Sequence, residues 1–213
     1  MAPGAEPRED CVLRNPVDAL THGLPRQWRI AIDWAVTILG AIAIVLAIKA
    51  YVVNPYRIPS SSMEPTLHCA RPGSGCMAQF SDRVLANRLI YHFREPRRGE
   101  IVVFKTPLAA ELACGGEGGT FVKRLIALPG ERWRVQDGIV YINDKRLDEP
   151  YVEESRRDGD MKAETKVPED SYVMLGDNRS SSCDSRRWGV VPRGNLVGPV
   201  FAVYWPPKRI GFR

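Results

Sequence analysis

A long apolar segment near the start of the chain places the strongest limit on how this sequence can fold. Residues 34–48 contain no charged side chain, and the apolar character extends over residues 30–53. About 24 residues in a helix, each adding about 1.5 Å, are enough to cross the hydrocarbon core of a bilayer. Asp33 and Lys49 flank the uncharged part, where a lysine can extend to the interface. We therefore expect residues 30–53 to form a transmembrane anchor.

A helix in the core of a soluble protein, or a cleaved secretory signal, could also produce such an apolar segment. A core helix should carry a polar stripe, and this segment has almost none. A cleaved signal needs small residues at the cleavage site, but Lys49, Tyr51 and Val52 follow the apolar run. Trp28 and Trp34 suit the headgroup zone of a membrane. The sequence thus favours an anchor that is retained.

The anchor divides the chain of 213 residues into three parts. Residues 1–29 are polar and interrupted by prolines, so we expect a loosely ordered tail on the cytoplasmic side. Residues 54–213 are long enough for a core of their own and should form one extracytoplasmic domain. Basic residues barely decide the orientation, but four cysteines follow the anchor, an even number that favours an oxidising outer compartment. Cys69 and Cys76 are close enough in sequence to form a small disulfide loop.

The extracytoplasmic part is predicted to be mainly β. It contains short apolar runs bounded by turn residues, and two of them flank Asp137-Gly138, a strong hairpin signal. Residues 153–166 are charged without an apolar period and are interpreted as an exposed loop or extension. The Gly-rich residues 108–119 are interpreted as a flexible loop.

The positive charge of the chain does not predict a nucleic-acid partner. The net charge is +5, and most of it is spread as single arginines. Arg94, Arg97 and Arg98 form the densest group, which we interpret as a solvated loop.

Ser62 and Lys123 are the candidate catalytic pair. Only seven of the 30 basic residues are lysine, and Lys123 lies in an apolar, strand-like run. A buried lysine can lose its proton and act as a general base, whereas an arginine cannot. Ser62 lies between Pro59 and Pro65, which restrict the backbone and can hold a nucleophile and nearby amide groups in a fixed relation. Each residue alone also fits a plain alternative, a surface loop for the serine and a solvent-facing strand for the lysine.

A third segment, residues 176–189, is dense in hydrogen-bonding groups and follows a predicted strand. It fits either a polar surface turn or a buried cluster of ion pairs that supports a site. Its length and spacing do not choose between the two.

Together these segments resemble the type I signal peptidases, membrane-bound Ser/Lys proteases that remove signal peptides. Four motifs occur in the order found in that family and cover nearly all of residues 30–205. The matching segments are Pro59-Ser60-x-Ser62-Met63-x-Pro65-Thr66-Leu67, a looser match at 82–87, then 98–104 with 122–124 and 128–131, and finally 176–179, 182–186 and 188–192.

The resemblance implies a role for each matched residue. Ser62 would be the nucleophile and Lys123 its general base. The Ser182 hydroxyl would hydrogen-bond the lysine amine, and the Ser60 hydroxyl would form the oxyanion hole with the Ser62 backbone N–H. The structural ion-pair partners near the site would be Arg124, Asp177, Asp184 and Arg186.

The resemblance also implies the setting of the reaction. The fold would be a β-rich domain behind a single membrane helix, in the plasma (inner) membrane, with the catalytic domain outside the cytoplasm. Substrates would be preproteins with small residues, usually alanine, at positions −1 and −3, and the enzyme would act beside the export translocon at the lipid bilayer. No metal, nucleotide or other cofactor would be used.

We expect Ile58, Met63 and Ile126 to line the substrate pocket. Cys183, next to Ser182, is either bonded to Cys114 or a packed thiol.

Several different functions remain as alternatives. A Ser/His/Asp hydrolase would use His68 or His92, but no motif surrounds either residue. A catalytically inactive binding domain would not need Ser62, Lys123 and Ser182 together. A peptidase specialised for pilins, a conjugation system or an organelle would keep the same residues. A soluble self-cleaving repressor is disfavoured by the anchor and by the lack of a DNA-binding helical module.

Overall fold

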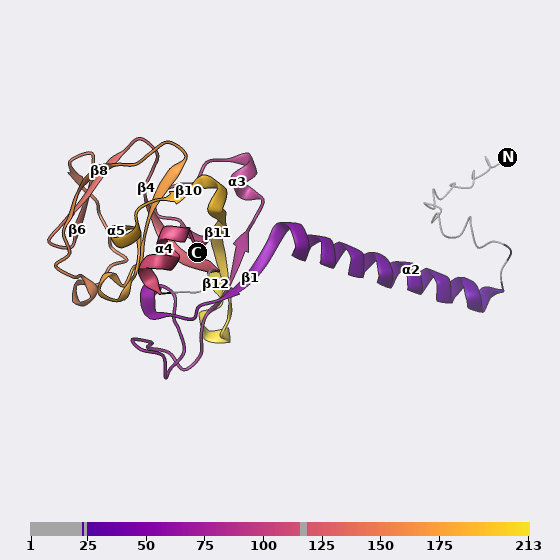
Figure 1. Cartoon of the computed structure of the whole chain (residues 1–213). Coiled ribbons are helices and arrows are strands. Elements are labelled where there is room, and N and C mark those ends of the chain that lie inside the picture. Colours follow the sequence, from indigo (N-terminus) through magenta and orange to yellow (C-terminus); the bar gives the residue numbers. More distant parts are fainter. Residues whose placement is uncertain (1–22, 24, 116–118) are drawn as a thin grey trace, which may run out of the picture. The chain divides into compact units, whose positions relative to one another are not determined.

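The computed structural model describes residues 23, 25–115 and 119–213 (Figure 1). The expected tail, residues 1–29, thus lies largely outside the described residues. The chain divides into two units, Met1–Ile48 and Lys49–Arg213, and each is described by itself.

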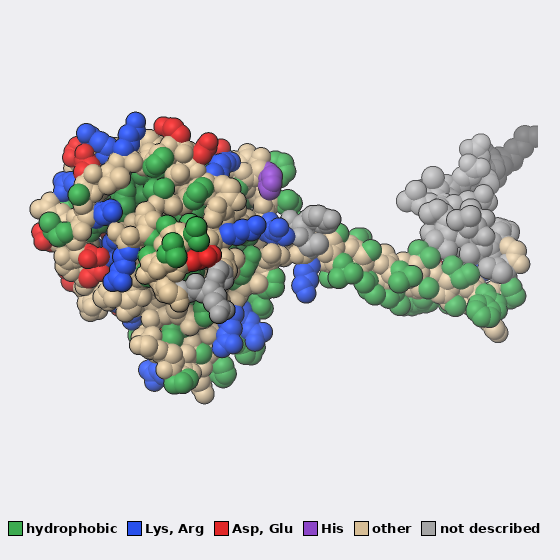
Figure 2. All heavy atoms as spheres, in the orientation of Figure 1, with side chains coloured by type: hydrophobic (Ala, Val, Ile, Leu, Met, Phe, Trp, Pro, Cys, Tyr) green, Lys and Arg blue, Asp and Glu red, His purple; other side chains and the backbone are tan. Residues whose placement is uncertain are grey.

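The first unit contains one long helix, α2, Arg26–Ala47. Its mean hydropathy reaches 2.3 and none of its residues is buried, so by length and composition it can cross a membrane. Figure 2 shows hydrophobic side chains along the whole helix. The helix begins four residues before the segment expected from the sequence. Beyond it, Ile48–Val52 form a π-helical turn and Val53 already belongs to a strand.

The second unit is built around a large antiparallel sheet. Its order is β1-β2-β11-β3-β4-β9-β10, with β12 paired to β11. Its strands are β1 Val53–Arg57, β2 Arg83–Asn87, β3 Ile101–Lys105, β4 Thr120–Ala127, β9 Ser171–Leu175, β10 Val191–Pro192, β11 Leu196–Trp205 and β12 Gly211–Phe212. Irregular register lets β11 pair with β3 near Leu196 and with β2 from Val200 onward. The sheet therefore curls along β11, and the prediction of a mainly β domain is confirmed.

A second sheet of four strands has the order β7-β6-β5-β8. Its strands are β5 Arg132–Gln136, β6 Ile139–Ile142, β7 Lys145–Arg146 and β8 Lys162–Lys166. The predicted hairpin joins β5 to β6, with positive φ at both Asp137 and Gly138, as a two-residue turn of this twist requires. The segment predicted as an exposed loop or extension contains β8, an exposed strand that pairs with β5.

Short helices connect the strands. They are α3 Ile90–Phe93, α4 Leu108–Cys114 and α5 Ser185–Trp188, with 3-10 turns η2 Ser61–Met63, η3 Glu154–Arg156, η4 Arg179–Ser181, η5 Arg193–Asn195 and η6 Pro207–Arg209. The prediction of a flexible loop over residues 108–119 was wrong at α4. Alanine, leucine and glutamate favour a helix there, Ala110 is buried, and Gly115 ends the helix with a left-handed backbone.

Two disulfides link loops of this unit. Cys69–Cys76 closes the small loop predicted from the sequence. Cys114–Cys183 joins the end of α4 to the segment before α5, which resolves the two possibilities for Cys183. Buried apolar residues fill both faces of β4: Leu125 packs with Phe104, and Ile126 packs with Trp133. Strand β4 therefore runs through the middle of the core.

Candidate active site

The backbone of Ser62 is held from outside its own segment. Ser62 lies in the 3-10 turn η2, which follows the extended Ser60. Asn178 donates its backbone N–H to the Ser62 carbonyl (3.1 Å) and its side-chain amide to the Ser61 carbonyl (3.0 Å). Gly176 packs so closely that a Cβ there would lie 2.5 Å from the Ser62 carbonyl oxygen. The turn after β9 thus fixes the serine segment.

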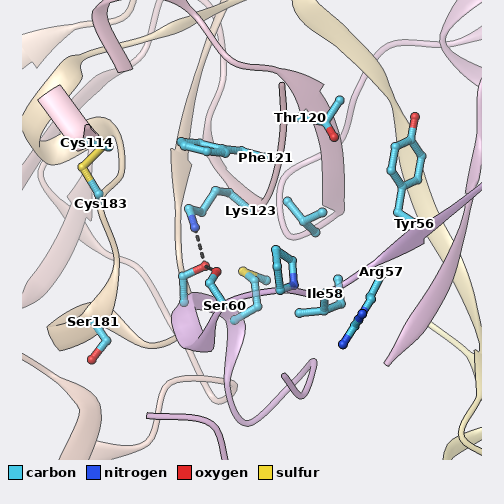
Figure 3. Close-up of a pocket in the computed structure, with 14 residues that line it drawn as sticks. Tyr56, Arg57, Ile58, Ser60, Cys114, Thr120, Phe121, Lys123, Ser181 and Cys183 are labelled. Atoms are coloured by element: carbon cyan, nitrogen blue, oxygen red, sulfur yellow. Dashed lines mark hydrogen bonds between the residues drawn. A yellow bond between two sulfur atoms is a disulfide. The ribbon is translucent and has the colours of Figure 1, made fainter. Parts of the chain in front are cut away.

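Lys123 reaches the serine from the neighbouring strand. It lies on β4, paired in register with Val102, and its side chain is buried with 5% of its surface exposed. Its Nζ donates to Ser62 Oγ at 2.5 Å (Figure 3). Burial lowers the pKa of Lys123 to about 8, partly opposed by the charges of Asp184 and Asp177, which favour the protonated amine. The amine can therefore exchange its proton near neutral pH.

Asp177 and Arg124 form a buried ion pair next to Lys123. Arg124 Nε and Nη2 donate to the two oxygens of Asp177 at 2.8 and 2.6 Å. The Thr66 hydroxyl also donates to Asp177 (2.6 Å), and the Arg124 guanidinium stacks 3.9 Å from the ring centroid of Tyr151. Arg124 is thereby held between the serine motif and the turn after β9.

Asp184 and Arg186 form a second pair on the other side of that turn. Asp184 caps α5, accepts the Gly176 N–H at 3.1 Å and binds Arg186 Nε at 2.8 Å. Arg186 also donates to Asp158 and to the Arg179 carbonyl. The four charged residues predicted near the site therefore all contribute to holding its loops.

Ser60 and Ser182 differ in their contacts with Ser62 and Lys123. Ser60 Oγ lies 3.2 Å from Ser62 Oγ. Ser182 Oγ is buried but has no hydrogen-bond partner among the described residues, so its expected bond to Lys123 is absent. The lysine amine instead donates to Ser62. Ser182 packs closely against Gly176, so a Cβ added to Gly176 would clash with the Ser182 hydroxyl oxygen.

A pocket of about 450 Å³ opens beside Ser62 and Lys123. Figure 3 shows it extending from the Cys114–Cys183 disulfide, past the lysine, toward Tyr56 and Thr120. Two of the expected lining residues, Ile58 and Met63, are present. The third expectation, Ile126, was wrong, because alternate residues of a strand face opposite sides and Ile126 packs with Trp133 in a separate core cluster.

The histidines considered as alternative bases lie elsewhere. His68 bonds to the buried carboxylate of Glu64, and His92 is exposed on α3. Neither lines the pocket. The described residues contain no group of three or more His, Cys, Asp or Glu side chains that could hold a metal ion. Of the pocket's polar side chains, the Ser62 hydroxyl and the Lys123 amine are in direct contact.

The match to known families extends over most of the chain. The model of the family described as signal peptidase, peptidase S26, matches residues 31–205. This chain belongs to the signal peptidase family. It is a serine endopeptidase.

Individual relatives support the same assignment. A probable signal peptidase I-2 of Synechocystis is 41% identical over 82% of this chain and 73% of its own length. Signal peptidase I of Bacillus amyloliquefaciens is 32% identical over 84% of this chain and 90% of its own. Thylakoidal processing peptidase 1 of Arabidopsis thaliana is 34% identical over 80% of this chain and 47% of its own length.

A further buried ion pair near the candidate site was not predicted from the sequence. Arg179 and Glu149 bind through two contacts, and Arg179 Nε also donates to the Gly176 carbonyl at 3.0 Å. Arg179 belongs to the matched fourth motif, which was the available signal. Glu149 lies in no motif, so only the folded chain connects it to the turn that holds Ser62.

Proposed function

We propose that Ser62 and Lys123 carry out the peptidase reaction of this enzyme, which removes signal peptides from preproteins. The observation that carries the proposal is the 2.5 Å contact between Lys123 Nζ and Ser62 Oγ, combined with burial that lowers the lysine pKa to about 8. When the lysine is protonated, its amine donates a hydrogen bond to Ser62 Oγ. Once the lysine is neutral, the same amine can accept the proton of the serine hydroxyl.

The reaction then proceeds through an acyl-enzyme. Ser62 Oγ forms a bond to the scissile carbonyl carbon while its proton moves to Lys123. The negative oxygen is stabilised by the Ser62 backbone N–H and the Ser60 hydroxyl. The C–N bond breaks as Lys123 returns the proton to the leaving amine. Lys123 next accepts a proton from water as the water oxygen bonds to the ester carbon. The bond from that carbon to Ser62 Oγ then breaks, Lys123 returns the proton to Ser62 Oγ, and the signal peptide leaves with a free carboxyl group.

Recognition of small residues is assigned to the pocket wall. Ile58, Met63 and Phe121 place apolar groups around the reactive pair. Such a wall accepts alanine at position −1 and excludes larger groups by their volume. Tyr56, at the far end of the pocket, is the corresponding candidate for position −3.

We further propose that α2 anchors the enzyme in the plasma membrane with the catalytic unit on the extracytoplasmic side. Two disulfides within that unit support an oxidising compartment. A membrane anchor keeps the enzyme at the level where a signal peptide leaves the bilayer, close to the translocon, and so raises the encounter frequency. Protease protection in sealed cells tests the orientation: cleavage of the catalytic unit only after the membrane is opened would contradict it.

The catalytic assignment is tested with the full chain in mild detergent and a preprotein ending its signal in Ala-x-Ala. Wild type should cut after the second alanine, while Ser62→Ala and Lys123→Arg should be folded and inactive. Lys105→Arg is the matched control, since Lys105 is an exposed lysine on the adjacent strand β3 and its replacement should leave the rate unchanged. Activity retained by Lys123→Arg would refute the general-base role, because arginine keeps the charge but cannot release its proton.

A further inference from the structure

We propose that a second pocket, lined by arginines and distinct from the pocket beside Ser62, binds a phosphate group. The pocket has a volume of about 550 Å³ and shares no lining residue with the pocket beside Ser62. Its charged lining residues are Arg94, Arg97, Arg98, Glu100, Arg124 and Arg213. From the sequence alone, the first three arginines were interpreted as part of a solvated loop. The fold brings them together with Arg124 and Arg213, which are distant in sequence.

The pocket holds more positive charge than its own acidic partners neutralise. Three of its arginines are paired: Arg94 with Glu100, Arg98 with Glu131 and Arg124 with Asp177. The side chains of Arg97 and Arg213 have no hydrogen bond or ion pair among the described residues. Five arginines against three carboxylates leave an excess of two positive side-chain charges.

The two unpaired arginines are attached to firmly held backbone. Arg97 lies in a turn that Glu100 closes by accepting the Arg97 N–H (3.1 Å), and Gly99 ties this turn to β4 through the Leu125 carbonyl (2.8 Å). Arg213 donates its N–H to the Phe201 carbonyl on β11 at 2.9 Å. The backbone of both residues is therefore already fixed, so a ligand would have to order only their side chains.

Phosphate is the anion that best fits this arrangement. A guanidinium donates in a planar fork that matches pairs of phosphate oxygens, and two unpaired forks can share one tetrahedral group. The remaining wall includes Ile101, Val200 and Phe201, which offer apolar contact to the carbon part of a phosphate ester. Two sources supply this chemistry, the headgroup of an anionic phospholipid and a soluble phosphate.

Binding can be measured without reference to peptidase activity, so its outcome is independent of the catalytic proposal. Calorimetric titrations of the full chain in neutral detergent would use two probes, pyrophosphate and a short-chain phosphatidylglycerol, at constant ionic strength. The double variant Arg97→Gln/Arg213→Gln removes the unpaired guanidinium groups. Lys145→Gln/Lys166→Gln is the matched control, because it removes two exposed positive charges from the smaller sheet.

We expect the arginine variant to weaken binding of at least one probe about a hundredfold, about tenfold for each charged hydrogen-bonding group lost. The lysine variant should bind as wild type does. Binding of pyrophosphate would identify soluble phosphate as the source, and binding of phosphatidylglycerol alone would identify the headgroup. No binding of either probe, or equal weakening in both double variants, would overturn the proposal.

Hydrogen exchange of wild type provides a second measure that does not depend on how the variants fold. The bound probe should protect residues 94–101 and 199–213 and leave residues 162–166 unchanged. Uniform protection, or none, would count against a site in this pocket.

Discussion

Replacing Lys123 with methionine should abolish peptidase activity and at the same time stabilise the catalytic unit. The lysine is buried, and its pKa falls from the ordinary 10.5 to about 8 because burial disfavours the charged amine. That difference corresponds to about 3 kcal/mol of stability lost at neutral pH, where the folded chain must hold a desolvated charge. Methionine has a similar length and needs no solvation.

The net gain is smaller than this difference because a hydrogen bond is lost. Removing the contact from Nζ to Ser62 Oγ costs about 1 kcal/mol, which leaves about 2 kcal/mol of net stabilisation. For a unit of this size we expect the melting temperature to rise by about 6 °C. The assay is thermal unfolding of the full chain in mild detergent, followed by near-ultraviolet circular dichroism, with Ser62→Ala as an inactive control that keeps the lysine.

The pH dependence gives the sharper test. Between about pH 8 and 10.5 the unfolded chain still holds the lysine proton and the folded chain has released it, so wild-type stability rises with pH over this window. The advantage of the methionine variant should therefore shrink across the same window. An advantage that stays constant with pH, or a variant less stable than wild type at neutral pH, would refute the argument that Lys123 is a desolvated base.

Three further predictions concern the same site. The peptidase rate should rise with pH and level off above about pH 8, as Lys123 loses its proton; a flat rate between about pH 6 and 10 would exclude a lysine base. Gly176→Ala should destabilise the unit by about 1–3 kcal/mol and reduce the rate, because the new Cβ meets the Ser62 carbonyl, whereas Gly194→Ala, in open space, should do neither in the same unfolding and rate assays. Asp177→Asn should cost about 3 kcal/mol in thermal unfolding, since a buried guanidinium loses its partner, and an unchanged melting temperature would contradict this.

Local patterns in the sequence were enough to predict much of the fold. The uncharged run became α2, and Asp137-Gly138 formed the expected hairpin turn, because both signals act over a few neighbouring residues. Helix α4 was not predicted because glycines dominate the residues that follow it, although Pro107 before it and the alanines within it are helix signals. The exposed strand β8 has no alternating apolar pattern, and only its pairing with β5 defines it.

The candidate site shows the same division. Ser62 and Lys123 could be named from their motifs, and the fold brings their side chains into contact. Local sequence could not predict whether Ile126 faces the pocket or the core, because this depends on how the two faces of β4 are covered in the folded chain. It also could not connect Glu149 to Arg179, since these residues meet only after distant strands have packed. Local sequence also could not predict that Ser182 makes no hydrogen bond to Lys123, because the folded structure decides which nearby oxygen the lysine amine contacts.

The hold of Asn178 on the serine segment has a consequence for biosynthesis. Its side chain binds Ser61 across 117 positions of sequence, and Asp177 binds Thr66 across 111. A growing chain thus carries the serine and the lysine long before it contains the turn that shapes them. Until Asp177 and Asn178 are present, the hydrogen bonds that hold the serine segment cannot form. We therefore expect Ser62 and Lys123 to be brought together only after residues 176–178 have been synthesised.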